Sequence, residues 1–209
     1  MPFKLSKIIV VSTAEGVEQQ GTDKKWAFNI FQNNDIYFYI DKNNEYKSEK
    51  QMYIDSVSIE NIEVINSPQI GEIKAYMPNS SEGRMYSYAE DSIVDEVLKY
   101  NGATRSDSRN LKIGNQGGNI AIRFSNTGIG KYESNDDEQI VHDGTLIKKL
   151  EKTTDEIKFT VNFDFIIVIN KNKYKAKITL DLPCGDIVEN GTANYEKSDM
   201  KDIIFKREK

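Results

Sequence analysis

The segment from Ile157 to Pro183 constrains the fold of this chain more than any other part of the sequence. Both of its arms place an apolar residue at every second position. The alternating residues are Ile157, Phe159, Val161, Phe163 and Phe165 in the first arm and Tyr174, Ala176, Ile178, Leu180 and Leu182 in the second. A period of two is typical of a strand that buries one face. The polar residues 170–173 between the arms predict a long antiparallel hairpin, which Pro183 ends because proline donates no hydrogen bond to a sheet.

Other alternating segments predict further strands around this hairpin. We expect them in residues 3–11, 57–64, 70–77, 120–124 and 203–205. A phase change of one residue between Ile59 and Ile62 predicts a β-bulge near Glu60 and Asn61. Two aromatic-rich runs, 26–30 and 36–40, flank the polar residues 32–35, which predicts a second hairpin with its turn at those polar residues.

A helix near residues 88–100 is predicted by a capping box and an apolar face. Ser87 and Glu90 have the spacing at which each side chain satisfies the other residue's backbone amide at a helix start. One face then collects Ala89, Ile93, Val94, Val97 and Leu98. Asn101-Gly102 supplies the left-handed residue that ends many helices. A second, short helix is predicted near residues 145–152, where Leu146, Ile147 and Leu150 share one face.

These patterns predict a mainly β protein with antiparallel sheets and long hairpins. Its fold class is either β-sandwich-like or α+β, the latter with the capped helix packed on a sheet. Because 209 residues suffice for one sizeable core, we expect residues 1–209 to form a single domain. Residues 79–118 could form a helix-plus-loop insertion between two β-rich halves.

Charge and cysteine content narrow the classes of function. The net charge is −5 and the pI is about 5.1, which makes nucleic acid an unlikely partner because phosphate binding needs a basic surface. With one cysteine and one histidine, no intramolecular disulfide and no Cys/His zinc or haem site can form, and we expect no cofactor. No apolar run reaches the ~18–20 residues that span a bilayer. We therefore expect a cytoplasmic protein.

One candidate catalytic pair consists of Cys184 and His142. A thiolate nucleophile needs a base within hydrogen-bond reach and a group that orients this base, a role that Asp143 could take. The pair would make the protein a cysteine-dependent hydrolase. A single cysteine is more often a small buried apolar residue, so we favour the structural interpretation.

Three other groups of residues are candidate binding sites. The long polar segment 104–119 carries Arg105, Arg109 and Lys112, which could pair with carboxylates or phosphates of a partner; the alternative is a solvated loop. The acidic run offers oxygen ligands for a metal but lacks the spacing of an EF-hand; its residues are Asp136, Asp137 and Glu138. Trp26 could stack on a small ligand or a sugar.

The leading functional hypothesis is a non-catalytic binding or assembly subunit that acts through protein–protein contacts. Many strands, long polar loops and strand edges favour it, and no set of acids, bases or ligands recurs at catalytic spacing, so an enzyme is the less favoured class. Abundant Asn, Lys, Ile and Tyr are typical of AT-rich genomes and suggest a bacterial or phage-encoded multi-protein complex. The partner would be another protein or further copies of the chain. The alternatives are a small-ligand or carbohydrate-binding β-sandwich and the hydrolase at Cys184.

Overall fold

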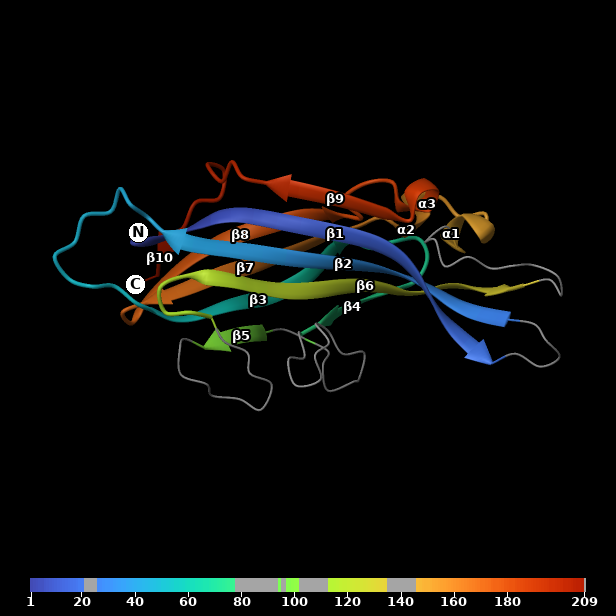
Figure 1. Cartoon of the computed structure of the whole chain (residues 1–209), viewed down its shortest axis with the longest axis horizontal. Helices are drawn as coiled ribbons and strands as arrows, with labels where there is room; N and C mark the ends of the chain where they lie inside the picture. Colours follow the sequence, from blue (N-terminus) through green and yellow to red (C-terminus); the bar gives the residue numbers. More distant parts are fainter. Residues whose placement is uncertain (21–25, 78–93, 95–96, 102–112, 135–145, 209) are drawn as a thin grey trace.

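The fold consists of two antiparallel sheets of five strands each (Figure 1). The computed structural model describes residues 1–20, 26–77, 94, 97–101, 113–134 and 146–208. In the order of their hydrogen bonding, the first sheet contains β4 (Glu72–Tyr76), β6 (Gly118–Glu133), β2 (Trp26–Lys42), β1 (Phe3–Gln20) and β9 (Thr192–Lys197). The second contains β10 (Lys206–Arg207), β8 (Asn172–Leu182), β7 (Phe159–Ile169), β3 (Ile54–Asn66) and β5 (Val97–Asn101). The mainly β class is thereby confirmed.

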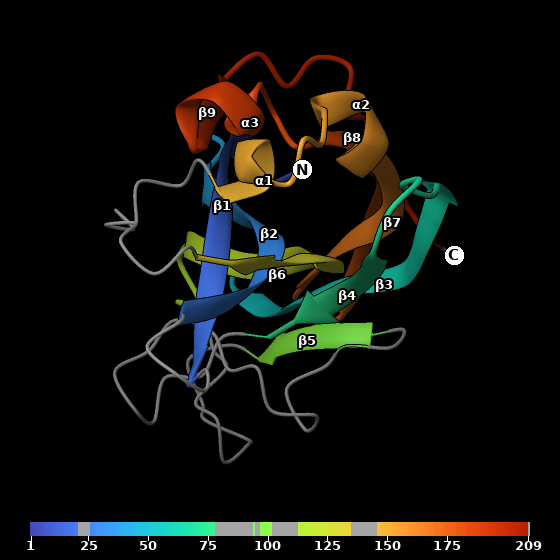
Figure 2. The same cartoon turned by 90° about the vertical axis from the view of Figure 1, so that its right-hand side faces the viewer.

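The sheets face each other as two layers (Figure 2), and the described helices gather at one end of them, on the right in Figure 1. These helices are α1 (Leu146–Lys149), α2 (Thr154–Ile157) and α3 (Ile187–Asn190). Both chain termini and β10 lie at the opposite end (Figure 1). Among the residues that the structure describes, no helix is long and apolar enough to cross a membrane.

Aromatic side chains from both sheets form the centre of the larger core. The ring of Phe38 in β2 lies 5.8 Å from that of Phe163 and 4.8 Å from that of Phe165, both in β7. Phe124 in β6 also stacks with Phe163. All four side chains are fully buried, so β2 and β6 lie opposite β7 across the sandwich. Burial of one such ring stabilises the fold by about 1.5–3 kcal/mol.

The central hairpin is confirmed as the pair β7 and β8. These strands keep one register from Phe159–Leu182 to Ile169–Asn172 without a break. Asn170 and Lys171 close the hairpin with positive φ angles of 45° and 65°, the left-handed conformation that a tight two-residue turn requires. The predicted bulge is confirmed as well, because the β3–β7 register shifts between Glu60 and Glu63 and Asn61 has a φ of 53°.

The second predicted hairpin is wrong. β2 runs without a turn from Trp26 to Lys42, and it forms its hairpin with β1 instead, through pairs from Phe3–Lys42 to Gln20–Trp26. The polar residues Gln32, Asn33 and Asn34, which suggested a turn, are fully buried inside this strand. Hydrogen bonds to neighbouring strands satisfy part of their polar groups, so the chain has no need to leave the sheet there.

The predicted helix near 88–100 is wrong over its C-terminal part, because Val97–Asn101 is strand β5 and pairs with β3. Alternation explains the burial there better than a helical face does. Leu98 and Tyr100 are buried, whereas Val97 is 55% exposed. Residues 88–93 and 95–96 lie outside the described residues. The short helix predicted near 145–152 is confirmed as α1, with Leu146 and Ile147 buried.

Candidate functional site

Most of the residues that the sequence suggested for a site fall outside the described part of the chain. These residues are Arg105, Arg109 and Lys112, the acidic Asp136, Asp137 and Glu138, and the pair His142 and Asp143. Trp26 is the first residue of β2, but the structure does not describe its side chain. Within the described residues, no three His, Cys, Asp or Glu side chains are grouped so as to hold a metal ion.

Cys184 is half-buried between the end of β8 and strands β1 and β9. Its sulfur lies 3.3 Å from the carbonyl oxygen of Ala193 and 3.7 Å from that of Val10. The hydroxyl of Ser12 lies 3.3 Å from the sulfur and accepts a hydrogen bond from the Cys184 backbone N–H at 3.0 Å. None of these groups is a general base. The surroundings of Cys184 therefore resemble those of a structural thiol that donates to backbone carbonyls.

A layer of polar side chains crosses the interior next to Cys184. It consists of Ser12 in β1, Gln32 and Asn34 in β2, and Asn126 in β6, all fully buried. Strand register places Ser12 beside Asn34 and Gln32 beside Asn126. The large core lies on one side of this layer. A smaller core with α1 and α3, which contains Ile30 and Ile129, lies on the other.

Hydrogen bonds satisfy only part of this polar layer. The Ser12 hydroxyl donates to Asn34 Oδ1 at 2.7 Å, and Gln32 Nε2 donates to the same oxygen at 3.2 Å. Asn126 Nδ2 donates to the carbonyl of Ile70 at 2.9 Å. Among the described atoms, Gln32 Oε1 and Asn126 Oδ1 have no donor. An unpaired buried carbonyl destabilises the folded state by about 1–3 kcal/mol.

The outer edge of β8 is open along most of its length. β10 pairs with β8 only at Tyr174 and Lys175. The carbonyl of Lys173 accepts from the Glu208 backbone N–H at 2.9 Å and so points away from β7. Because backbone direction alternates along a strand, the N–H and C=O groups of Lys177, Thr179 and Asp181 point to the same side. The described residues supply no partner for these backbone groups.

A cleft of about 260 Å³ lies beside this open edge. Thr179, Leu180 and Asp181 of β8 and Cys184 line one side, and Val10 of β1 with Tyr195 and Lys197 of β9 line the other. Leu180 points toward the interior yet is only half-buried, in contrast to Ile178, which is 3% exposed. We name Lys177, Thr179 and Asp181 the free edge, and the adjoining space the edge cleft.

Charged side chains surround the free edge on the outer face of the second sheet. Burial pushes the pKa of Asp164 upward, but the hydrogen bond from Asn61 and the ammonium groups of Lys175 and Lys177 outweigh it, so this pKa lies below its ordinary value. The hydrogen bond to Glu208, together with Asp164, raises the pKa of Lys175. Within the described part of the chain, Lys177 pairs with Asp164 alone, at 3.9 Å, and its side chain is 61% exposed. Its charge thus remains accessible to a partner.

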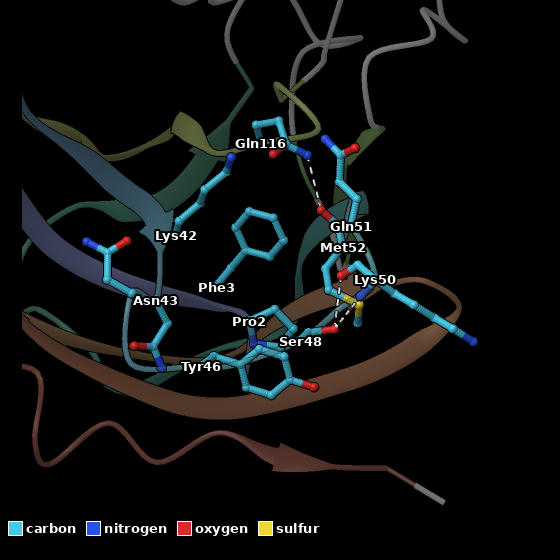
Figure 3. A pocket seen from close by; sticks show the side chains of 11 residues that line it. Pro2, Phe3, Lys42, Asn43, Tyr46, Ser48, Lys50, Gln51, Met52 and Gln116 are labelled. Carbon is cyan, nitrogen blue, oxygen red and sulfur yellow. Dashed lines mark hydrogen bonds between the residues drawn. The ribbon is translucent and has the colours of Figure 1, made fainter.

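A second cleft, of about 310 Å³, opens at the end of the sandwich near the N-terminus (Figure 3). The buried Phe3 ring lies at its centre, with Lys42 and Gln116 on one side and Tyr46 on the other (Figure 3). Gln116 Nε2 donates to the Met52 carbonyl at 3.1 Å, and no described residue donates to its side-chain oxygen. We name this space the end pocket.

Sequence reasoning placed the residues of the free edge on a strand but did not show that this edge of the sheet is open. Alternation shows which side chains face the core, whereas an open edge depends on which strands pair. The lysines on the polar face of β8 are the one feature of the sequence that could have indicated an open edge, because charged residues are frequent on exposed edge strands. Comparisons of the chain with models of protein families, with curated proteins and with solved structures found no significant match.

Proposed function

We propose that this protein is a non-catalytic binding subunit that takes up an extended segment of a partner protein as a further strand beside β8. The free edge carries the proposal, because a row of unpaired backbone donors and acceptors is a template for strand addition. A subunit of a bacterial or phage-encoded multi-protein complex, which the composition suggests, could join its neighbour in this way.

The energy of such a contact comes from two sources. Three edge residues offer six backbone groups, and each hydrogen bond contributes roughly 0.5–1.5 kcal/mol net. Ordering a segment of about five residues costs roughly 1–2 kcal/mol per residue. The two amounts nearly cancel, so side chains that enter the edge cleft must supply most of the affinity. This requirement would make the contact selective for the partner's sequence.

Substitution of Thr179 tests the proposal. Its N–H points to the open side, so Thr179→Pro removes no backbone hydrogen bond of the folded chain but removes the central donor of the edge. The exposed side-chain hydrogen bond from Thr179 Oγ1 to Asn162 Oδ1, at 3.2 Å, is lost in Thr179→Pro and Thr179→Ala alike. Thr179→Ala keeps this N–H and serves as the control. Affinity capture from the source lysate, with identification by mass spectrometry, should give the same proteins for the parent and Thr179→Ala, and these proteins should be lost with Thr179→Pro. An identical set of proteins with all three baits would contradict the proposal, provided that circular dichroism shows an intact fold.

The end pocket supports a second candidate function, the binding of a small polar ligand such as a sugar. Amide side chains and an aromatic ring are typical of such sites, and this pocket has Asn43, Gln51, Gln116 and the exposed Tyr46. Gln51 is exposed and makes no hydrogen bond through its side chain to the described residues. Gln51→Ala should therefore weaken sugar binding on a glycan array without a change in melting temperature. Equal binding by parent and variant would remove this candidate.

A further inference from the structure

The shape of the space beside β8 restricts what can occupy it. β2 faces β7 through the contact of Phe38 with Phe163, and β1 faces β8, because Val10 and Leu180 line the same cleft. The next strand of the first sheet is β9, whose Tyr195 and Lys197 line the outer side of this cleft. β9 therefore covers the strand position next to β8 in the second sheet. Strand β10 occupies this position only at Tyr174 and Lys175.

From this geometry, and resting on the function proposed above, we infer that the occupant of the edge cleft is an isolated extended segment of another protein, about five residues long. Strand β10 stops it at Lys175. Beyond Pro183 the chain crosses to β9, where a Cβ on Gly185 would lie 2.9 Å from that of Ala193. Residues Lys177 to Asp181 remain open between these two limits.

A second copy of this chain does not fit the same space. Its own β8 would be complementary in charge, since antiparallel pairing about Thr179 places Lys177 opposite Asp181. However, each β8 carries β1 in the layer above it, and the second copy's β1 would fall where β9 already lies. A tail or a loop of a partner has no such second layer and can slide beneath β9.

The side chains around the free edge define the sequence of this segment. Positions opposite Ile178 and Leu180 point into the edge cleft, next to Val10 and Cys184, and favour small apolar residues. The outward positions face Lys177 at one end and Asp181 at the other, and cross-strand pairs of opposite charge are favourable. In antiparallel orientation the best segment therefore reads base–apolar–polar–apolar–acid from its N-terminus.

Two blocked peptides of identical composition test this inference on the full chain. The expected ligand is Lys-Val-Thr-Val-Glu, and Glu-Val-Thr-Val-Lys is its control. NMR spectra of the labelled protein should show slowed amide exchange at Lys177, Thr179 and Asp181 with the first peptide, and roughly tenfold weaker binding of the second. Lys177→Glu should remove this preference, and Thr179→Pro should remove binding of both peptides.

The possible outcomes separate the inference from the proposed function. Equal binding of the two peptides, or binding of neither, overturns the inferred sequence pattern, while the proposed function stands if capture from lysate still depends on Thr179. If native mass spectrometry shows a dimer that Thr179→Pro dissociates, the occupant is a second copy, and the inference is wrong. If lysate capture is unchanged by Thr179→Pro, the free edge is not the binding site and both proposals fail.

Discussion

Replacement of Gln32 by methionine should stabilise this protein, although Gln32 is fully buried and hydrogen-bonded. The side chain donates one hydrogen bond, from Nε2 to Asn34 Oδ1, while its own Oε1 has no donor within the described structure. Removal of the amide does not leave Asn34 Oδ1 unpaired, because the Ser12 hydroxyl donates to the same oxygen at 2.7 Å. Methionine has a similar length and adapts to irregular space.

The expected gain follows from two opposing contributions. Loss of the hydrogen bond to Asn34 costs about 1 kcal/mol, whereas removal of an unpaired buried carbonyl returns roughly 1–3 kcal/mol. The net gain in the free energy of unfolding should be about 1 kcal/mol. For a chain of this length, that corresponds to an increase in melting temperature of roughly 2–4 °C.

Urea denaturation followed by circular dichroism measures this change, and Asn34→Leu is the matched control. The Asn34 substitution removes the acceptor of Ser12 and the donor to the Phe124 carbonyl, so it should destabilise by about 3 kcal/mol. A loss of more than about 1 kcal/mol in Gln32→Met would refute the reasoning, because it would mean that Gln32 Oε1 is satisfied in solution.

Three further predictions concern the edge, an acid and the thiol. Thr179→Pro should abolish partner capture while it changes the melting temperature by only a few degrees, as measured by calorimetry; unchanged capture would argue against strand addition. The pKa of Asp164 in the folded state lies below its ordinary value of 3.8, so this carboxylate stabilises the fold above that pH and ceases to do so as pH falls through the folded pKa. The difference in unfolding free energy between the parent and Asp164→Asn should shrink as the pH falls below about 4, and a constant difference would contradict this. Cys184→Ser should stay within about 1 kcal/mol of the parent in chemical denaturation, because a hydroxyl can donate to the Ala193 carbonyl that the thiol contacts; a larger loss would show that packing of the sulfur dominates.

Local patterns sufficed to predict the strands whose alternation is regular. The β7–β8 hairpin followed from its apolar positions, and the bulge at Asn61 followed from one change of phase. The polar residues of β2 could not be placed in this way, since their partners Ser12 and Phe124 are distant in sequence. Buried polar groups resemble a turn until the strands that satisfy them are known.

The predicted helix near 88–100 shows the limit of short apolar patterns. Val94, Val97 and Leu98 have helical spacing, but Leu98 and Tyr100 also stand two positions apart, as the apolar face of a strand requires. Pairing with β3 makes this segment a strand rather than a helix, and the local sequence does not reveal that pairing. The candidate site was missed for the same reason, because an open edge is a property of the whole sheet rather than of β8 alone.

The polar layer through the interior also bears on how cooperatively the molecule unfolds. Side chains on either side of it, such as Phe38 and Ile30, belong to different hydrophobic clusters. The polar groups between these clusters add little hydrophobic stabilisation that would hold the two clusters together. The long strands β1, β2 and β6 run through both clusters and couple them. We expect the end with α1 and α3 to open as a sub-global unit at lower free energy than the rest, which native-state hydrogen exchange at Ile30 and Phe38 would resolve as two distinct opening energies.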